Sequence, residues 1–201
     1  MTDSKEVNSE YIENKDLKSI ISYASKLNKK LPPVEEWEPD FCGNIYMVIK
    51  RDGHWFYMGT PINRKGLIRL FSTILRKDED GETYLITPVE KVRITVEDAP
   101  FLAVEMNVQG TGKDQVLTFR SNTDDVIVAD HEHPLRFEID TENDGLKPYL
   151  LIRGRLEALL ARAITYDLIA LGEELKIDGE KYFAVYSQGE LFPIIPADRL
   201  L

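Results

Sequence analysis

Short strand-like segments dominate the second half of this sequence. From Lys91 onward, apolar and β-branched residues recur in short runs, and Gly, Pro, Asn and Asp separate the runs. The segments that we expect to form strands are 101–108, 115–121, 126–130, 135–139 and 149–152. Runs of this kind are typical of strands joined by turns. The sequence therefore predicts a β-rich second half.

Three other segments show helical periodicity. Apolar residues at the i, i+3, i+4 and i+7 positions predict a helix over 64–77 and a second, long helix over 153–171. Residues 14–29 carry a similar apolar face, which predicts a short amphipathic helix near the N-terminus. Residues 31–40 contain three prolines, so we expect an extended connector there.

Turn residues predict two hairpins. Within 45–59, the pair Asp52-Gly53 separates two aromatic and β-branched segments, and this pair suits a tight turn with positive φ. Residues 83–88 predict a single strand, and residues 181–195 predict a hairpin that closes the chain.

A short internal repeat indicates two related halves. The segment DGETYL at 80–85 returns as DGEKYF at 178–183, which is 98 positions later, and each copy follows a predicted helix. The repeat predicts a duplication with a boundary near 90–100. Coincidence is the alternative, because Asp-Gly pairs also occur at 52–53 and 144–145.

These patterns together predict an α+β protein with two small, related domains. A chain of 201 residues is long enough for such an arrangement. The predicted parts are an N-terminal tail and helix at 1–30, an α+β domain at 31–91 and a β-rich domain at 92–201.

Composition narrows the possible functions. Cys42 is the only cysteine, so the chain has no intrachain disulfide and no cysteine-based zinc site. The formal charge of −10 opposes binding to nucleic acid, whose phosphates favour a basic surface. The N-terminal residues lack the apolar region of a signal peptide, and no apolar run approaches the roughly 18 residues of a membrane span. We expect a cytoplasmic protein that binds neither nucleic acid nor membranes.

Two histidines near the middle of the chain invite comparison with a metal site. His131, His133 and Glu138 have the spacing of the first cupin motif, and this donor set suits a divalent metal. However, Asp125 stands where that motif begins with glycine, and His54 is the only further histidine. The later strand that should supply another ligand falls in a predicted helix. We therefore favour a solvent-exposed turn.

Other catalytic motifs fail on spacing. Residues 109–114 suggest a P-loop, but Asn107 stands where that motif needs glycine and Asp114 where it needs serine or threonine. The segment also joins two predicted strands. Glu97 and Asp98 are adjacent, so in a strand they point to opposite faces. No nucleophile elbow is present. We assign no catalytic residues, no metal ligands and no cofactor.

Cations near predicted helix starts are the best candidates for a binding site. A cation at a helix N-terminus opposes the helix dipole, and a bound anion relieves that cost. Arg64 and Arg153 lie at the starts of the two long predicted helices. Solvated arginines that pair with the 35 acidic residues are the alternative.

The resulting hypothesis is a small anionic ligand bound between the two halves. The candidate residues are Trp55, Arg64, Glu90, Lys91, Arg93, Asp98, Tyr149 and Arg153. In this hypothesis the cations contact the anion, an aromatic ring stacks on a planar group, and a carboxylate orients polar groups.

Several longer elements of the sequence resemble a known family. Gly-x-Trp-x-Tyr at 53–57 is followed by Pro-Ile-x-Arg at 61–64, Thr-Pro-x-Glu-Lys lies at 87–91, and Val-Glu-Asp-Ala-Pro-Phe lies at 96–101. Together with residues 148–168, these elements resemble an uncharacterised, largely proteobacterial family of domain-of-unknown-function proteins.

The resemblance covers about residues 31–171 and carries its own expectations. It implies a duplicated α+β core and a C-terminal domain similar to a pleckstrin-homology domain, which is a β-rich half-barrel with a helix. It also implies a pocket between the domains for a nucleotide-like ligand and a signalling role, and it supplies no catalytic residues. A pleckstrin-like shape does not by itself imply phosphoinositide binding.

Two alternative functions accompany this hypothesis. The N-terminal helix and the connector at 31–40 can dock a protein partner or a second copy of the chain, which describes a scaffold without a small ligand. The other alternative is a metal-dependent enzyme built on His131, His133 and Glu138.

Overall fold

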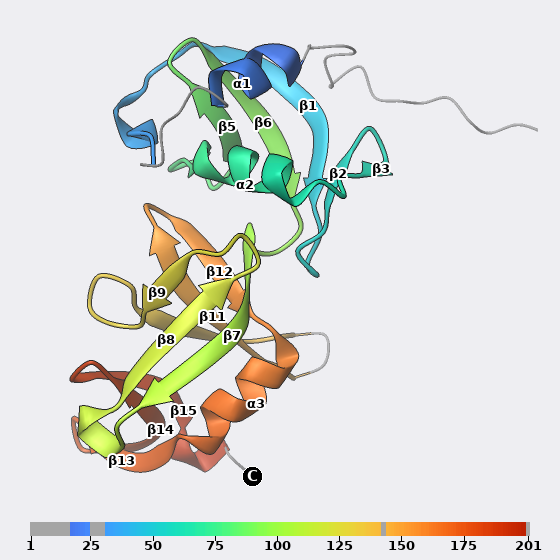
Figure 1. Cartoon of the computed structure of the whole chain (residues 1–201). Helices are drawn as coiled ribbons and strands as arrows, with labels where there is room; N and C mark the ends of the chain where they lie inside the picture. The colour runs from blue at the N-terminus through green and yellow to red at the C-terminus, as the bar shows by residue number, and fades with distance from the viewer. Residues whose placement is uncertain (1–16, 25–30, 142–143, 200–201) are drawn as a thin grey trace, which may run out of the picture. The chain divides into compact units, whose positions relative to one another are not determined.

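The computed structural model describes residues 17–24, 31–141 and 144–199 (Figure 1). The chain divides into two compact units, Met1–Glu97 and Asp98–Leu201. Both units are mostly β-sheet with few helices, so the two-domain arrangement that the sequence predicts is confirmed at this level. Within the described ranges, no helix is long and apolar enough to cross a membrane.

The first unit contains a six-stranded sheet in the order β3-β2-β1-β6-β5-β4. Its strands are β1 (Phe41–Ile49), β2 (Trp55–Tyr57), β3 (Thr60–Pro61), β4 (Leu75–Lys77), β5 (Thr83–Thr87) and β6 (Glu90–Val96). The central strands β1 and β6 run parallel, and the other neighbouring pairs are antiparallel. Register shifts bend β1, and the sheet curls over the helices α1 (Leu17–Ala24) and α2 (Lys65–Thr73) (Figure 1).

One face of this sheet and its helices enclose the first core. Ile49 lies opposite Trp55 in the register of β1 and β2, and both side chains are buried. The Trp55 ring stacks on Phe71 of α2 at a centroid distance of 6.3 Å. A second buried row crosses the sheet through Leu85 and Val92, which are register partners.

Local sequence signals predict most of this unit correctly. β1 and β2 form the expected hairpin around Asp52-Gly53, where Gly53 has a φ of 81°. The N-terminal helix is present over Leu17–Ala24, and the rest of its predicted range lies outside the described residues. The connector includes one short 3-10 helix, η1 (Val34–Glu36).

The helix predicted over 64–77 is too long. It ends at Thr73, and β4 (Leu75–Lys77) follows it directly. Ile74 and Leu75 fit the helical period, but residues 75–77 pair with β5. This pairing satisfies the backbone groups of β4 that face β5, and both apolar side chains are still buried.

The second unit contains another six-stranded sheet, in the order β10-β11-β12-β7-β8-β9. Its strands are β7 (Phe101–Gln109), β8 (Val116–Ser121), β9 (Val126–Val128), β10 (Leu135–Ile139), β11 (Leu146–Arg153) and β12 (Leu156–Leu160). A short η2 (Gly112–Asp114) lies between β7 and β8. The five strands that the sequence predicts at the start of this unit are confirmed.

A smaller sheet completes the second unit after helix α3 (Arg162–Ala170). It consists of β13 (Glu173–Ile177), β14 (Glu180–Ser187) and β15 (Glu190–Pro196), followed by η3 (Ala197–Arg199). β14 and β15 form the predicted final hairpin. Ser187 of β14 joins this sheet to the larger one, because its Oγ donates to the Ala129 carbonyl at 2.6 Å.

The long helix predicted over 153–171 is wrong in its first half. Gly154 has a φ of 52°, and the chain turns there into β12. β12 pairs with β11 on one side and with β7 on the other. Leu156, Ala158 and Leu160 are buried at alternate positions. The same leucine-rich stretch fits a helical period, so periodicity alone could not distinguish the two.

The two large sheets have the same strand order. In each, the first and sixth strands of the unit form a parallel pair at the centre, and two antiparallel strands flank each side. β6 lies wholly within the first sheet, so the division between units falls after Glu97.

Candidate functional site

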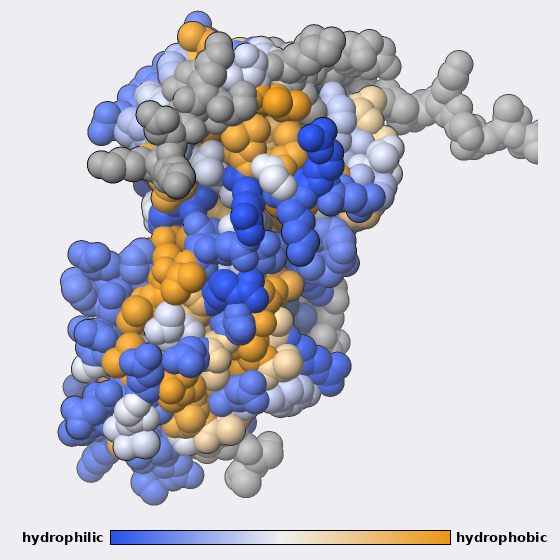
Figure 2. Space-filling model, in the orientation of Figure 1, coloured by the Kyte–Doolittle hydropathy of each residue, from blue (hydrophilic) through white to orange (hydrophobic). Residues whose placement is uncertain are grey.

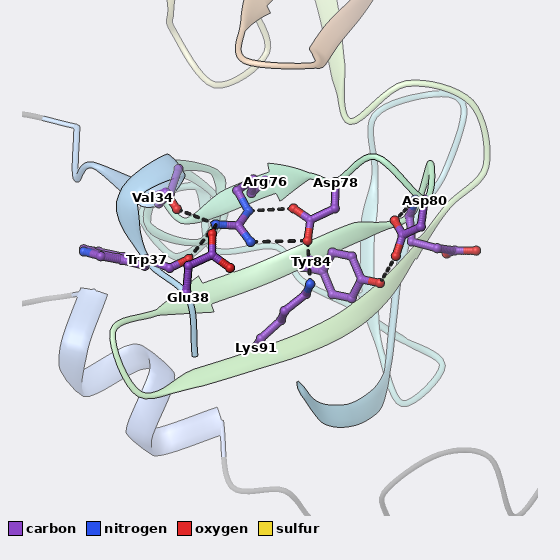
Figure 3. Close-up of polar contacts among 9 residues, drawn as sticks. Val34, Trp37, Glu38, Arg76, Asp78, Asp80, Tyr84 and Lys91 are labelled. Atoms are coloured by element: carbon purple, nitrogen blue, oxygen red, sulfur yellow. Dashed lines mark hydrogen bonds and ion pairs between the residues drawn. The ribbon is translucent and has the colours of Figure 1, made fainter. Parts of the chain in front are cut away.

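Polar side chains from three neighbouring strands gather on the second face of the first sheet (Figure 3). The strand registers align Arg76 of β4, Tyr84 of β5, Arg93 of β6 and Asn44 of β1 in one row across the sheet. Because successive strand residues point to opposite faces, this row lies opposite the buried row of Leu85 and Val92. Lys91 lies two residues before Arg93 and therefore points to the same face.

Arg76 is the most buried cation of this group, with 5% of its surface exposed. Its Nε donates to Asp78 Oδ1 at 2.6 Å, and its Nη2 donates to Asp78 Oδ2 at 3.2 Å. Its Nη1 donates to two carbonyl oxygens of the connector, those of Val34 at 2.9 Å and Trp37 at 2.7 Å. Arg76 thus ties residues 34–38, which we call the strap, to the sheet.

Asp78 receives a second cation. Lys91 Nζ donates to the Oδ2 atom that Arg76 also contacts. Burial by itself would raise the pKa of the Asp78 carboxyl, but the hydrogen bonds from Arg76 and Lys91 outweigh burial and hold this pKa below its ordinary value. Asp78 is therefore a charged carboxylate shared by two cations at neutral pH.

Tyr84 lies beneath Lys91. The Lys91 Nζ is 4.2 Å from the centre of the Tyr84 ring, which is a cation–π distance. The Tyr84 hydroxyl donates to Asp80 Oδ2 at 2.6 Å. Burial, followed by this hydrogen bond, raises the pKa of Tyr84 to about 12. Tyr84 therefore remains a neutral hydrogen-bond donor over the physiological range.

The three cations differ in exposure, and the two cations of β6 are more exposed than Arg76 of β4. The exposed side-chain fraction is 6% for Arg76, 20% for Lys91 and 34% for Arg93. The carboxylate of Glu82 lies 3.8 Å from Arg93 Nη1, which is longer than a direct hydrogen bond. We call these three residues the cationic face.

The other candidates of the first unit lie elsewhere. Trp55 is 1% exposed, and Phe71 covers one side of its ring. Arg64 is the exposed N-cap residue of α2. Glu90 accepts a hydrogen bond from Ser19 Oγ at 2.9 Å, which joins it to α1.

Asp98 and Tyr149 come together in the second unit. The Tyr149 hydroxyl donates to Asp98 Oδ1 at 2.7 Å, and Lys147 Nζ lies 3.1 Å from Asp98 Oδ2. Burial, then the hydrogen bond to Asp98, raises the pKa of Tyr149. Arg136 lies 4.3 Å from the centre of the Tyr149 ring. The ring is 4% exposed, so protein atoms occupy its surroundings.

Arg153 does not begin a helix, which corrects the sequence-based placement. It is the last residue of β11, and α3 begins at Arg162. Its guanidinium lies 5.0 Å from the centre of the Phe101 ring and 3.4 Å from Asp125 Oδ1. Burial lowers the pKa of Arg153, and Asp125 partly offsets that effect.

The histidines lie in the turn between β9 and β10. His131 has 74% of its side chain exposed, and His133 Nδ1 is 3.1 Å from the Leu151 carbonyl oxygen. Glu138 forms an ion pair with Arg136. Among the described residues, no group of three or more His, Cys, Asp or Glu side chains is placed to hold a metal ion.

Sequence reasoning identified Lys91 and Arg93 but missed Arg76, Asp78 and Tyr84. Arg76 lies inside the helix predicted over 64–77. A helical position gave no reason to place its side chain on the same sheet face as Lys91 and Arg93. The available signal was the Arg-x-Asp spacing at 76–78, because residues two apart in a strand share a face.

Two family models match this chain. Residues 32–99 match "Domain of unknown function (DUF1285), N-terminal domain", and residues 100–194 match "Protein of unknown function (DUF1285), C-terminal domain". The chain belongs to the DUF1285 family. The resemblance that the sequence motifs indicated is therefore confirmed.

Two solved structures of DUF1285 family proteins are similar to this chain. The crystal structure of a DUF1285 family protein from Silicibacter pomeroyi DSS-3 at 2.50 Å is 45% identical, covers 88% of this chain and 94% of that chain, and has a TM-score of 0.81. A DUF1285 family protein from Shewanella baltica OS155 is 29% identical, covers 63% of this chain and 91% of that chain, and has a TM-score of 0.49. A comparison with curated proteins found no match.

Proposed function

We propose that this DUF1285 protein is a non-catalytic binding module for a small anionic ligand, and that the cationic face is its binding surface. The observation that supports this is the alignment of Arg76, Lys91 and Arg93 on one face of β4 and β6. A chain with a net charge of −10 places three cations there, beside the carboxylates of Asp78 and Glu82. Clustered cations attract anions locally even when the net charge is negative.

The spacing of the cations suits a group with several acceptor oxygens. Arg76 and Arg93 are two strand spacings apart, so their Cα atoms are separated by roughly 10 Å. Lys91 and Arg93 are separated along β6 by about 7 Å. Side chains of this length converge readily on one phosphate or on two linked phosphates, and arginine supplies paired N–H donors for such groups.

Lys91 and Arg93 make the first contacts in this proposal, because they are the more exposed cations. Phe41 adds an apolar surface beside them. It is the register partner of Lys91, is 56% exposed, and meets the Tyr84 ring edge-on at 6.1 Å. A nucleotide-like ligand would place its anionic group at the cations and its planar group on Phe41.

The fold also supports two further proposals, a duplication and a likeness to a pleckstrin-homology domain. The shared strand order of the two large sheets supports a duplication, although it matches β5 with β11 whereas the sequence repeat matches β5 with β14. The β-rich second unit, with α3 as its described α-helix, supports the likeness to a pleckstrin-homology domain. Superposing the two sheets in an experimental structure tests the duplication, and a mismatch of the central parallel strands would reject it.

A cytoplasmic signalling role fits these properties. The single cysteine, Cys42, suits a reducing compartment, and a module that binds a ligand without converting it is suited to sensing. Fractionation of cells that express the chain tests the location, and recovery outside the cytoplasm would contradict it.

A protein-interaction module is the second candidate. Apolar residues reach the surface of each unit among hydrophilic ones (Figure 2). Among the described residues of the first unit, the exposed large apolar side chains are Leu31, Phe41, Tyr46, Met58 and Val89. Such side chains can contact a partner or a second copy of the chain. Light scattering across a concentration series separates a monomer from a homo-oligomer.

Calorimetric titration with inorganic pyrophosphate and with adenine nucleotides tests the binding proposal. We expect Lys91→Gln and Arg93→Gln each to weaken binding about tenfold or more, because each removes a charged contact worth roughly 1.5–3 kcal/mol. Arg120→Gln is the matched control, since Arg120 is an exposed, ion-paired arginine of the second unit. Equal affinity in wild type and both first-unit variants would reject the cationic face as the binding surface.

A further inference from the structure

The strap of residues 34–38 lies against Arg76, one of the three cations that the proposed ligand would use. Its sequence is VEEWE, so three of its five residues are acidic. The Glu38 carboxylate is 3.8 Å from Arg76 Nη1, although 83% of its side chain is exposed. Glu35 and Glu38 both favour the charged form of Arg76, after the larger effect of Asp78. The strap therefore presents negative charge to the cationic face.

The strap also occupies the Nη1 group of Arg76, whereas Nε and Nη2 donate to Asp78. Two backbone carbonyls, those of Val34 and Trp37, accept from the one Nη1 group, and Figure 3 shows both contacts on the strap side of the guanidinium. An anionic group with several oxygens makes the same kind of contact with stronger, charge-assisted hydrogen bonds. Because both strap carbonyls accept from Nη1, a ligand that binds Nη1 must displace them.

The composition of the strap region suits reversible release. Pro32, Pro33 and Pro39 flank the strap, and proline fixes φ at about −65°, which limits the backbone conformations of bound and released states alike. The internal hydrogen bonds of η1, from Glu36 N to Pro33 O and from Trp37 N to Val34 O, connect residues within this segment. They can persist when the segment moves as one piece.

We propose that the strap is an intramolecular competitor, whose carbonyls and carboxylates hold Arg76 until an anionic ligand displaces them. This inference rests on the proposed binding function. In the strap-bound state Arg76 is covered, and Lys91 and Arg93 form the accessible part of the cationic face. Ligand binding releases the strap and adds Arg76 to the contacts, so the strap sets the affinity of the site and signals its occupancy.

Neutralising the strap tests this competition. We expect the variant Glu35→Gln, Glu36→Gln, Glu38→Gln to bind inorganic pyrophosphate about fivefold more tightly than wild type, which is the low end of typical coupling between sites. The three carboxylates are exposed, so the variant should fold. The matched control is Glu173→Gln, Glu174→Gln, Glu180→Gln, which removes three exposed carboxylates from the smaller sheet of the second unit.

Tryptophan emission provides the second readout. The chain has two tryptophans, Trp37 in the strap and the buried Trp55. We expect pyrophosphate to change the emission of wild type and of Trp55→Phe, and to leave that of Trp37→Phe unchanged.

The outcomes separate this inference from the function on which it rests. Pyrophosphate binding that is equal in the strap variant and in its charge-matched control, with no Trp37 response, overturns the competition while the binding function stands. Absence of binding in wild type and in both variants overturns the binding function and the competition together. Tighter binding only in the strap variant, with a Trp37 response, supports both.

Discussion

Arg76 and Asp78 lie two residues apart and face each other through two hydrogen bonds, Nε to Oδ1 at 2.6 Å and Nη2 to Oδ2 at 3.2 Å. Both side chains are largely buried, with exposed fractions of 6% and 18%. Arg76 Nη1 donates to the strap, and Asp78 Oδ2 accepts a hydrogen bond from Lys91. This one pair therefore connects β4, β6 and the strap.

Replacing Asp78 should destabilise the first unit. In Asp78→Asn, a buried guanidinium loses its charged partner, and we expect the free energy of unfolding to fall by about 3 kcal/mol. Urea denaturation followed by tryptophan emission measures this, because Trp37 and Trp55 both lie in the first unit. Lys50→Gln removes an exposed cation that pairs with Glu97 and should leave the transition nearly unchanged. Equal transitions for the two variants would contradict the structural role of Asp78.

The same pair predicts how stability depends on acid. The pKa of Asp78 is lower in the folded chain than its ordinary value of about 3.9. Its contribution is therefore complete above pH 5 and is lost as the pH falls through the folded pKa. We expect the difference in unfolding free energy between wild type and Asp78→Asn to be constant from pH 5 to 7 and to shrink below about pH 4. A difference that grows on acidification would mean that the pKa is raised.

The Tyr84 hydroxyl should lose its proton at a higher pH than an ordinary tyrosine. Because its pKa is raised to about 12, its contribution to stability is complete below pH 10, the ordinary value, and is lost as the pH rises toward 12. Phenolate absorbance should show a late component in wild type that Tyr84→Phe reduces. Asp80→Asn removes the carboxylate acceptor and should move this component to lower pH, while burial keeps it above 10. Superimposable curves for wild type and Tyr84→Phe would contradict the assignment.

Alanine substitutions at two glycines should change the free energy of unfolding in opposite directions. A Cβ on Gly172 would lie 2.4 Å from two atoms of the Phe183 ring and 3.2 Å from the Ile169 carbonyl oxygen. We expect Gly172→Ala to cost about 1–2 kcal/mol, since the ring must shift. Gly66 lies in α2 with nothing within 4 Å of its added Cβ, so Gly66→Ala should stabilise by roughly 0.5–1 kcal/mol. Thermal unfolding followed by circular dichroism measures both, and a stabilised Gly172→Ala would show that the ring moves without cost.

Elements that depend on neighbouring residues were predictable from the sequence. The hairpin around Asp52-Gly53 follows from one pair that tolerates positive φ. The β-rich character expected from Lys91 onward is confirmed by β6, which begins at Glu90. In both cases the deciding interactions are local, so the sequence by itself determined them.

Two segments that fit a helical period needed the tertiary structure. Residues 156–160 and 75–77 fit a helical period, yet each forms a strand because a neighbouring strand is available to pair with it. Pairing partners that are distant in sequence decide between helix and strand at such positions.

The sequence by itself thus determined the family, the β-rich second half and the choice of Lys91 and Arg93 as candidate binding residues. Only the tertiary structure decided that Arg76 joins them, that Asp78 and the strap neutralise it, and that Trp55 and Tyr149 are buried. The physical reason is register: a side chain's face follows from local alternation, but its neighbours across a sheet depend on how separate strands align.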